Sequence, residues 1–477
     1  MINLKDIVSA LTGHTFTLLD QPISSAVIDS RQAAKGSLFI ALPGEQVDGH
    51  DYVQPAFDNG AILALVDKDL NTAMHVLDLR QGYFQPALVR DIELPLCLRV
   101  EDALLALHAI ATQWRQAHPV RTIGITGSVG KTTTKELISA LLSKKASVLK
   151  NPGNRNNEIG LPLTLLELEP QHQYAVLEMG FYVPGEIQTL CEIARPQVGV
   201  ITNIGMVHAE RAGSQAIIAK GKAELVESLP PAPEGVAILN MDDPWVRKMA
   251  EKTEARVLSY GITEQSDLMA RDIQTRGLEG ISCILSTKGE NHLVHSPLLG
   301  AFSAYTILCA AAVALTEGLD WPAITAGLAE SRVDLRMRPL HLPNDITVLD
   351  DTYNASPTST IAALALLREL SGRRVAVLGD MLELGQYEHI GHQNVGVAAV
   401  SAADALILIG ERSKIIAESA LNEGFPPEHI QWFPNSIQAA FEIWNFVQQG
   451  DVILVKGSNS MRMDHVLAAL QEARDGK

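Results

Sequence analysis

The sequence predicts a three-domain α/β protein in which helices cover mainly parallel β-sheets. At 477 residues the chain has room for about three domains of ~150 residues each. Short apolar, β-rich runs alternate with helical patterns through the middle and the last third of the chain, which is typical of parallel sheets. A glycine-rich turn, GSVG at 127–130, joins one of these strands to a helix and has the form of an anion-binding loop.

Composition and charge narrow the possible partners. A hydrophobic content of 47% and a charged content of 19% are ordinary for a chain that forms a core. A formal net charge of −17 disfavours nucleic acid and anionic membrane as partners, because both would repel this surface. The chain start has polar residues inside every apolar stretch, and later apolar runs are too short to cross a bilayer. We therefore expect a cytoplasmic monomer with no nucleic-acid partner and no membrane insertion.

The four cysteines, Cys97, Cys191, Cys283 and Cys309, are scattered and show no paired or metal-ligand spacing. This usage predicts buried thiols in a reducing compartment.

Residues 1–97 are expected to form the first domain. A strand ends in IDSR at 28–31, the β-rich run GSLFIALPG follows at 36–44, and a helix at 53–60 ends at a glycine. Ser30 and Arg31 follow the first strand. They either decorate a turn or hold the phosphate or base of a ligand, and the residues alone leave both possibilities open.

Residues 98–331 are expected to form the second domain, which a helix at 101–118 introduces. The strand 122–126 leads into the glycine turn, and a helix opens directly after it. In such a loop backbone N–H groups bind phosphates, the lysine reaches the terminal phosphates and a hydroxyl holds Mg²⁺. Ile125 replaces the first glycine of the strict P-loop pattern, but the compact variant TGSVGKTT still predicts an ATP site. Its candidate residues are Gly127, Ser128, Val129, Gly130, Lys131, Thr132 and Thr133.

Further strands at 146–149, 175–178, 198–202 and 236–240 should complete a mainly parallel sheet, and ligands gather at the carboxyl ends of such strands. Glu178 and Asn240 occupy two of these ends, and Glu178 suits a carboxylate near the nucleotide's metal. His208 follows a third strand, although a lone histidine is more often structural. Asn156 and Asn157 lie in a loop that either forms turns or lines a polar pocket.

The rest of this domain reads as a helix, an antiparallel patch and a second helix. The helix at 218–225 carries Lys220 and Lys222, and two such lysines normally form a solvated face. Short strands and turns from about 258 to 300 predict the antiparallel patch. An alanine-rich helix follows at 301–318.

Residues 332–477 are expected to form a third, Rossmann-like domain with strands at 346–350, 374–378, 405–409 and 451–455. Polar turns follow these strands. The pattern resembles a dinucleotide-binding topology, but it contains no G-x-G-x-x-G, so NAD is not predicted.

Together these stretches resemble the Mur ligase family of peptidoglycan synthesis over essentially the whole chain. The first domain carries DSR and GSLFIALPGEQVDGHDY. The second carries GITGSVGKTTTKEL, GNRNNEIGLPLTLL, VLEMG, TNIGMVH and AKGKAEL, and the third DDTYNASPTS, VLGDMLELG and LVKGS.

The resemblance implies an ATP-dependent amide ligase that uses Mg²⁺ and adds D-alanyl-D-alanine to UDP-N-acetylmuramoyl-tripeptide through an acyl phosphate. Lys131 and Thr132 would contact ATP and Mg²⁺, and Glu178, His208 and Lys222 would complete the metal site. Lys222 matches a lysine that is commonly carbamylated in this family, with Lys220 as the alternative register. Two alternatives remain: another amide ligase of this architecture, forming the tripeptide or acting on folate, and a non-catalytic binder of UDP-sugar peptides.

The resemblance also assigns substrate contacts. Ser30 and Arg31 would hold the UDP end, and Asn156 and Asn157 would line the acceptor or nucleotide region. From the third domain, Arg338 and Asp351 would contact ATP. Tyr353 and Asn354 would border the D-alanyl-D-alanine site. Asn240 is a further expected nucleotide contact.

The chain departs from the family at one point. Family members usually read G-x-H-N-x-x-N at the start of the alanine-rich helix, where this chain reads GAFSAYT. Phe302, Ser303 and Thr306 therefore replace a histidine and two asparagines. Hydroxyls keep some hydrogen bonding but lose the paired donor and acceptor of an amide. Either ATP binds more loosely here, or the adenine base is held differently.

Overall fold

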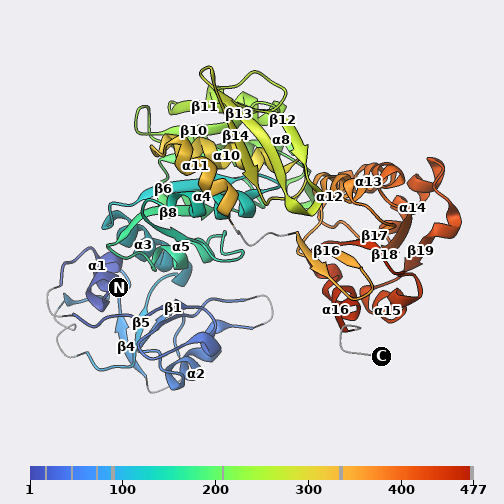
Figure 1. The fold of residues 1–477 in the computed structure, drawn as a ribbon. Coiled ribbons are helices and arrows are strands. Elements are labelled where there is room, and N and C mark those ends of the chain that lie inside the picture. Colours follow the sequence, from blue (N-terminus) through green and yellow to red (C-terminus); the bar gives the residue numbers. More distant parts are fainter. Residues whose placement is uncertain are drawn as a thin grey trace. The chain divides into compact units, whose positions relative to one another are not determined.

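The structure is a computed structural model that describes residues 1–16, 19–44, 47–70, 74–86, 92–206, 209–331 and 337–472. The chain divides into two compact units, and Figure 1 colours it along the sequence. The first unit comprises Met1–Gly124, Ala146–Gly180 and Glu186–Gln197; the second comprises Ile125–Lys145, Phe181–Gly185 and Val198–Lys477. Mixed helices and strands with parallel pairing confirm the predicted α/β class.

The first part of the first unit is a small parallel sheet. Its five strands lie in the order β1-β2-β3-β5-β4, and the apolar runs of β2, β3 and β5 are buried. The strands are β1 (Ala26–Val27), β2 (Leu38–Ile40), β3 (Leu63–Val66), β4 (His75–Asp78) and β5 (Leu96–Arg99). The α-helices here are α1 (Leu4–Thr12) and α2 (Val53–Asp58).

The rest of the first unit begins with a long helix. α3 (Ala103–Gln116) starts where the Asp102 side chain accepts a hydrogen bond from the Leu105 N–H, as an N-cap does. β7 (Ser147–Lys150) and β8 (His172–Glu178) pair in parallel. Two helices complete this part, α5 (Gly160–Leu165) and α6 (Glu186–Ala194).

β6 (Arg121–Thr126) runs from the first unit into the second, where the loop and α4 (Lys131–Leu142) follow it. In the second unit β9, β10, β11 and β12 pair in parallel, and β12, β13 and β14 then pair antiparallel, as the sequence predicts. These strands are β9 (Val198–Ile201), β10 (Val236–Asn240), β11 (Arg256–Gly261), β12 (Leu268–Thr275), β13 (Ile281–Thr287) and β14 (Glu290–Ser296).

One buried helix organises this region. α10 (Ser303–Thr316) is apolar nearly all round, and it packs against α4 and against the strands β10 to β13. It therefore fixes the loop's helix on the sheet. The other α-helices are α7 (Ala209–Ala212), α8 (Gln215–Glu227), α9 (Pro244–Arg247) and α11 (Trp321–Glu330).

The last part of the second unit is a six-stranded sheet in the order β15-β16-β20-β17-β18-β19, parallel except for the edge strand β15. Two apolar cores cover its faces, with α12, α13 and α14 on one side and α15 and α16 on the other (Figure 1). The strands are β15 (Arg338–His341), β16 (Thr347–Asp351), β17 (Arg374–Gly379), β18 (Ala405–Ile409), β19 (Ile430–Phe433) and β20 (Val452–Lys456). The helices are α12 (Pro357–Glu369), α13 (Glu388–Ala402), α14 (Ser413–Asn422), α15 (Ser436–Glu442) and α16 (Asp464–Glu472).

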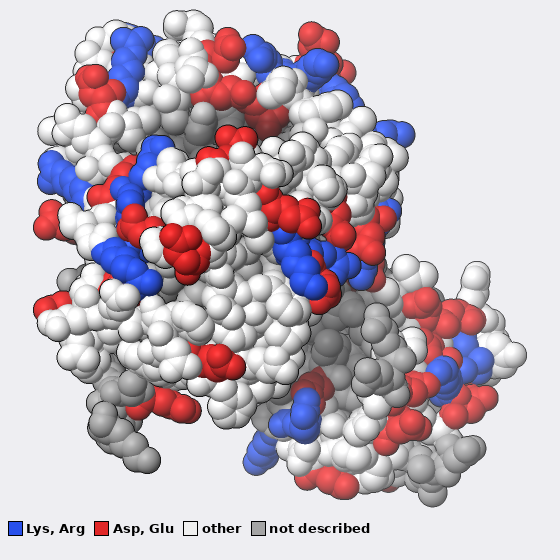
Figure 2. All heavy atoms as spheres, turned by 90° about the vertical axis from the view of Figure 1, so that its right-hand side faces the viewer, with Lys and Arg blue, Asp and Glu red and all other residues white. Residues whose placement is uncertain are grey.

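Three further observations concern the surface charges, the cysteines and the helices. On the face shown in Figure 2 acidic and basic side chains are interspersed. All four cysteines are buried as thiols. Among the described helices, none combines the length and the apolar character that crossing a bilayer requires.

Candidate active site

The glycine-rich loop has backbone geometry that requires glycine. Gly127 has a φ of +148° and Gly130 a φ of +87°, a region that L side chains rarely adopt. A Cβ at Gly127 would also overlap the hydroxyl of Thr202. Because α4 begins at Lys131, the N–H groups of its first turn and the positive end of its dipole lie at this loop. The structure thus has the strand-loop-helix geometry of an anion site.

Residues that follow β9 hold the loop in place through hydrogen bonds. The Thr202 hydroxyl and the Asn203 amide both donate to the Val129 carbonyl, at 2.7 and 2.9 Å, and the Asn203 Oδ1 accepts from the Val129 N–H at 3.0 Å. The Ser128 hydroxyl accepts from the Gly205 N–H at 2.8 Å. These polar groups at a strand end therefore shape the loop, which is a structural role that strand-end position alone does not reveal.

Two lysines converge on one carbonyl of the loop. Lys131 Nζ donates to the Gly127 carbonyl at 2.8 Å, and Lys222 Nζ donates to the same oxygen at 3.1 Å. Lys222 lies on α8, is only 1% exposed, and its ammonium lies 5.0 Å from the centre of the Phe181 ring. Lys220 is exposed. The structure therefore brings Lys222, and not the alternative Lys220, to the loop.

A buried carboxylate terminates β8 in the first unit. Asn156 donates from Nδ2 to Glu178 Oε1 at 2.8 Å. Asn151 binds both backbone groups of Glu178, accepting from its N–H and donating to its carbonyl, each at 2.9 Å. Asn157 instead accepts from the Gly160 N–H at 2.8 Å, at the start of α5. Of the two predicted asparagines, Asn156 orients Glu178 while Asn157 shapes a helix start; sequence reasoning missed Asn151.

The donors present suit Mg²⁺ better than a softer metal. Thr132, in the first turn of α4, offers a hydroxyl and Glu178 a carboxylate, both hard oxygen ligands. Within the described residues no three Asp, Glu, His or Cys side chains form a metal-binding group. Mg²⁺ usually takes one or two carboxylates and completes its shell with phosphate oxygens and water. Each of these oxygens is a donor of the kind that Mg²⁺ takes; the predicted ligand His208 lies outside the described residues.

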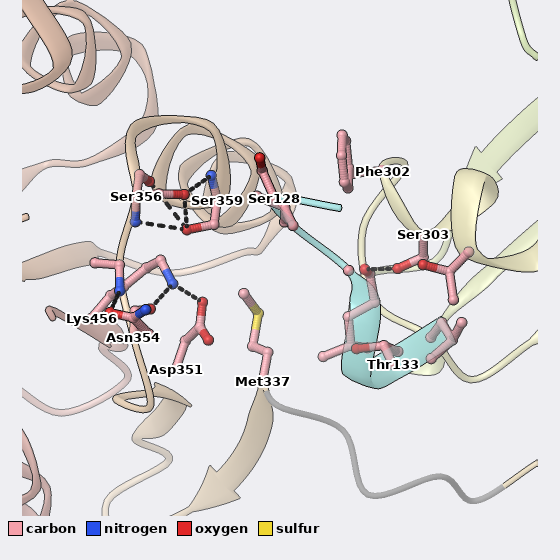
Figure 3. A pocket seen from close by; sticks show the side chains of 16 residues that line it. Ser128, Thr133, Phe302, Ser303, Met337, Asp351, Asn354, Ser356, Ser359 and Lys456 are labelled. Carbon is pink, nitrogen blue, oxygen red and sulfur yellow. Dashed lines mark hydrogen bonds and ion pairs between the residues drawn. The ribbon is translucent and has the colours of Figure 1, made fainter. Parts of the chain in front are cut away.

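A pocket of the second unit joins the loop to the start of α10 and to the last sheet (Figure 3). It combines polar groups of the loop and of the strand ends with an apolar wall. The side chains that define it are Ser128, Val129, Thr133, Leu298, Leu299, Phe302, Ser303, Thr306, Met337, Asp351, Asn354, Ser356, Ser359 and Lys456.

Two hydroxyl groups at the start of α10 have hydrogen-bond partners elsewhere in the chain. The Ser303 hydroxyl donates back to the Leu299 carbonyl at 2.6 Å, and the Tyr305 hydroxyl donates to Asp242 Oδ2 at 2.9 Å. Burial and the bond to Asp242 raise the pKa of Tyr305, so the phenol stays protonated. The Phe302 ring, 5.4 Å from the Tyr305 ring between centroids, is left facing the pocket.

The remaining residues predicted for the nucleotide and D-alanyl-D-alanine sites divide into three groups. Asp351 and Asn354 line the pocket. Asn240 instead donates to the Thr202 carbonyl at 3.0 Å and accepts from the Asp242 N–H at 3.1 Å, so it ties β10 to β9. Arg338 is exposed on the edge strand β15, and Tyr353 is exposed in the turn after β16.

Lys456 is a pocket residue that the sequence interpretation placed in a polar turn without assigning it a role. It ends β20, and its ammonium donates to Asp351 Oδ2 at 2.6 Å and to the Asn354 carbonyl at 2.8 Å. The signal in the sequence is its position: Lys456 directly follows the apolar run VILV and opens the turn KGS, as expected of a residue at a strand end.

A second pocket lies within the first unit. Ser30 and Arg31, the two residues predicted to hold the UDP end of the substrate, both line it. Ser30 is buried, and its carbonyl accepts from Asn59 Nδ2 at 2.9 Å. Arg31 is exposed, and its guanidinium binds Asp29 with a shortest distance of 2.7 Å. Tyr52 is at the same pocket. A guanidinium, paired with Asp29, and an aromatic ring thus lie at this pocket, and both are groups that can contact a phosphate-bearing ligand with a planar base.

Models of one family match most of the chain. The Mur ligase family catalytic domain matches residues 22–115, the Mur ligase middle domain residues 125–314, and the glutamate ligase domain of Mur ligases residues 335–459. The chain is 36% identical over 466 residues to a UDP-N-acetylmuramoyl-tripeptide--D-alanyl-D-alanine ligase of Synechocystis, covering 97% of this chain and 95% of the relative. An enzyme of the same name from Escherichia coli is 35% identical, with 95% of each chain covered.

Solved structures give the same picture. A crystal structure of MurF from Acinetobacter baumannii has a TM-score of 0.84 to this chain at 28% identity, with 98% of each chain covered. MurF from Thermotoga maritima in complex with ADP has a TM-score of 0.78 at 27% identity, covering 94% of this chain and 97% of that one.

Proposed function

The chain belongs to the Mur ligase family, and from this we propose that it is an ATP-dependent ligase that joins D-alanyl-D-alanine to UDP-N-acetylmuramoyl-tripeptide. The observation that carries the proposal is a phosphate-type loop that lines a pocket, in a chain that is similar over nearly its full length to ligases of this activity. The domain division at 1–97, 98–331 and 332–477 belongs to the same proposal.

The chemistry explains why such a loop is needed. A peptide carboxylate is a poor electrophile, so ATP's γ-phosphoryl group passes first to the terminal carboxylate of the tripeptide, giving an acyl phosphate and ADP. The free amine of D-alanyl-D-alanine then attacks the acyl carbon, and phosphate leaves. Two anions meet in the first step, so Lys131 and the N–H groups at the start of α4 stabilise the charge that builds up on the phosphoryl oxygens.

Mg²⁺ would act in the phosphoryl-transfer step. Thr132, Glu178, His208 and carbamylated Lys222 would hold Mg²⁺, which supplies further positive charge to the phosphates. Asn156 supports this arrangement because it fixes the Glu178 carboxylate from the side. Thr133, Asn240, Asp351 and Arg338 are assigned to the nucleotide.

The remaining assignments concern the other substrates. Ser30 and Arg31 hold the UDP end, Asn157 borders the acceptor region, and Tyr353 and Asn354 border the D-alanyl-D-alanine site. Positioning of this kind is worth up to ~7–11 kcal/mol of the barrier through effective molarity. Buried thiols at all four cysteines fit a cytoplasmic location, and a monomer suffices for every assigned contact.

The decisive assay measures phosphate release from ATP and Mg²⁺ with UDP-N-acetylmuramoyl-tripeptide, with and without D-alanyl-D-alanine. We expect release that requires both partners, together with a pentapeptide product in the mass spectrum. Release with another amine or another acceptor would identify a different amide ligase of the family. Binding of the nucleotide-sugar peptide without release would contradict the ligase and leave a non-catalytic binder, for which the apolar start of α10 is the supporting observation.

We further propose that the nucleotide's base packs against Phe302. Replacing Phe302 by alanine is expected to raise KM for ATP about tenfold, since stacking a base on an aromatic ring is worth ~1–3 kcal/mol. Initial rates at varied ATP measure this, and KM for the UDP-peptide should change less than about twofold. The matched control is Phe441→Ala, at a phenylalanine that is 85% exposed on α15. An unchanged KM for ATP in the Phe302 variant would remove the ring from the base site.

A further inference from the structure

A buried ion pair joins the ends of two neighbouring strands in the last sheet. β16 and β20 pair in parallel, and Asp351 is the direct register partner of Lys456. Both residues are the last of their strands. The Lys456 side chain is 2% exposed and the Asp351 side chain 12%. This edge of an open parallel sheet is where ligands usually bind.

The ammonium of Lys456 organises two groups at once. It donates to Asp351 Oδ2 at 2.6 Å and to the carbonyl of Asn354 at 2.8 Å (Figure 3). The first bond fixes the carboxylate, and the second fixes the turn that carries the chain from β16 into α12. Lys456, Asp351 and Asn354 all line the pocket that contains the phosphate-type loop.

Stability alone is a weak reason for this pair. Burying two charges costs much of what their attraction returns, and apolar residues of similar size often serve as well. The pocket supplies a better reason. A lone carboxylate facing a polyphosphate would repel it, whereas a carboxylate neutralised by Lys456 keeps its acceptor oxygens without adding net negative charge.

We propose that Lys456 is a positioning residue for the nucleotide, which it serves by holding Asp351 and the 351–354 turn at the pocket. This inference rests on the proposed function, because it takes the pocket to be the ATP site. Lys456 acts through Asp351 and not on the transferred phosphoryl group. Its removal should therefore weaken ATP binding and leave the UDP-peptide site intact.

The first test is kinetic. Lys456→Met is expected to raise KM for ATP about tenfold, with KM for UDP-N-acetylmuramoyl-tripeptide within about twofold of the parent value. Lys456→Arg keeps a cation at the strand end and should recover most of the affinity. The matched control is Lys414→Met, which removes an exposed lysine from an ion pair with Glu411 in the same part of the chain. Thermal unfolding of each variant identifies the temperature range in which all are folded.

A double-mutant cycle then separates positioning from structural support. If Lys456 acts through Asp351, Lys456→Met should add less than about twofold to KM for ATP in an Asp351→Asn background. Equal effects in both backgrounds, or a parallel rise in KM for every substrate, would overturn the proposal. An unchanged KM for ATP in Lys456→Met would do the same. Should the methionine variant not fold, Lys456→Arg and Lys456→Gln carry the same comparison, and inactivity of the parent protein would instead refute the ligase assignment.

Discussion

Replacing Lys131 by methionine is expected to lower kcat/KM for ATP by about 10³-fold, the range found when a single charged or hydrogen-bonding group is removed from a phosphoryl-transfer or oxyanion site. The Lys131 ammonium lies at the loop, 2.8 Å from the Gly127 carbonyl. Methionine keeps the length and the apolar stem of lysine but offers no charge to the transferred phosphoryl group. Phosphate release with all three substrates measures the loss.

The fold should survive this change. Lys131 is the first residue of α4 and is half-buried, so methionine fits the helix and leaves its buried face untouched. The matched control is Lys144→Met, which removes an exposed lysine just beyond α4 that pairs with Glu330. Near-normal activity in the Lys131 variant would mean that the loop does not bind the reacting phosphates, and the pocket would need another ligand.

The sheets were predictable from sequence where strands are buried on both faces. β10, β17, β18 and β20 are continuous apolar runs, and the predicted strands match them to within about a residue. The structure adds β15 and β19, which the sequence interpretation missed. Both are edge strands of the last sheet, only four residues long, and β15 contains a proline. Short, half-exposed edges lack the continuous apolar signal.

The loop was equally accessible to sequence reasoning, because its glycines and lysine are consecutive. Contacts between residues on neighbouring strands could not be predicted from the sequence in this way. Lys456 meets Asp351 only because β20 lies beside β16, and the two residues are 105 positions apart in the chain. Asn203 likewise braces Val129 from a separate strand end. Asn240 also depends on a strand neighbour: its side-chain amide donates to the Thr202 carbonyl at the end of β9, while its contact with the nucleotide stays a prediction.

Lys222→Ala is expected to lower kcat by about 10³-fold, and the reason lies in the charges at the loop. Lys131 and Lys222 both donate to the Gly127 oxygen, so two ammonium groups lie close together in a largely buried site. Like charges at such separations repel by roughly 3 kcal/mol at an effective dielectric constant near 20. Carbamylation removes this conflict: the neutral amine of Lys222 attacks CO₂, a C–N bond forms, one proton is released, and the product is an anion beside the Lys131 cation.

The carbamate makes the variants distinguishable. Lys222→Ala should regain activity with a short-chain carboxylate such as acetate, which can occupy the vacated space and supply the missing anion. Lys222→Arg should stay inactive with or without acetate, because its guanidinium does not form the carbamate and restores the repulsion. The control is Lys220→Ala, at the exposed lysine of the same helix, which should keep parent activity.

A spectroscopic measurement tests the modification without relying on turnover. Protein equilibrated with ¹³C-bicarbonate should show one carbamate carbon signal that is absent from Lys222→Ala and retained in Lys220→Ala. Full activity in Lys222→Ala, or a signal that survives the substitution, would contradict the assignment. If the signal is absent from the parent while activity still depends on Lys222, the lysine works as a cation, and the close approach of two ammonium groups then has to be offset by the phosphates of ATP, which both would contact.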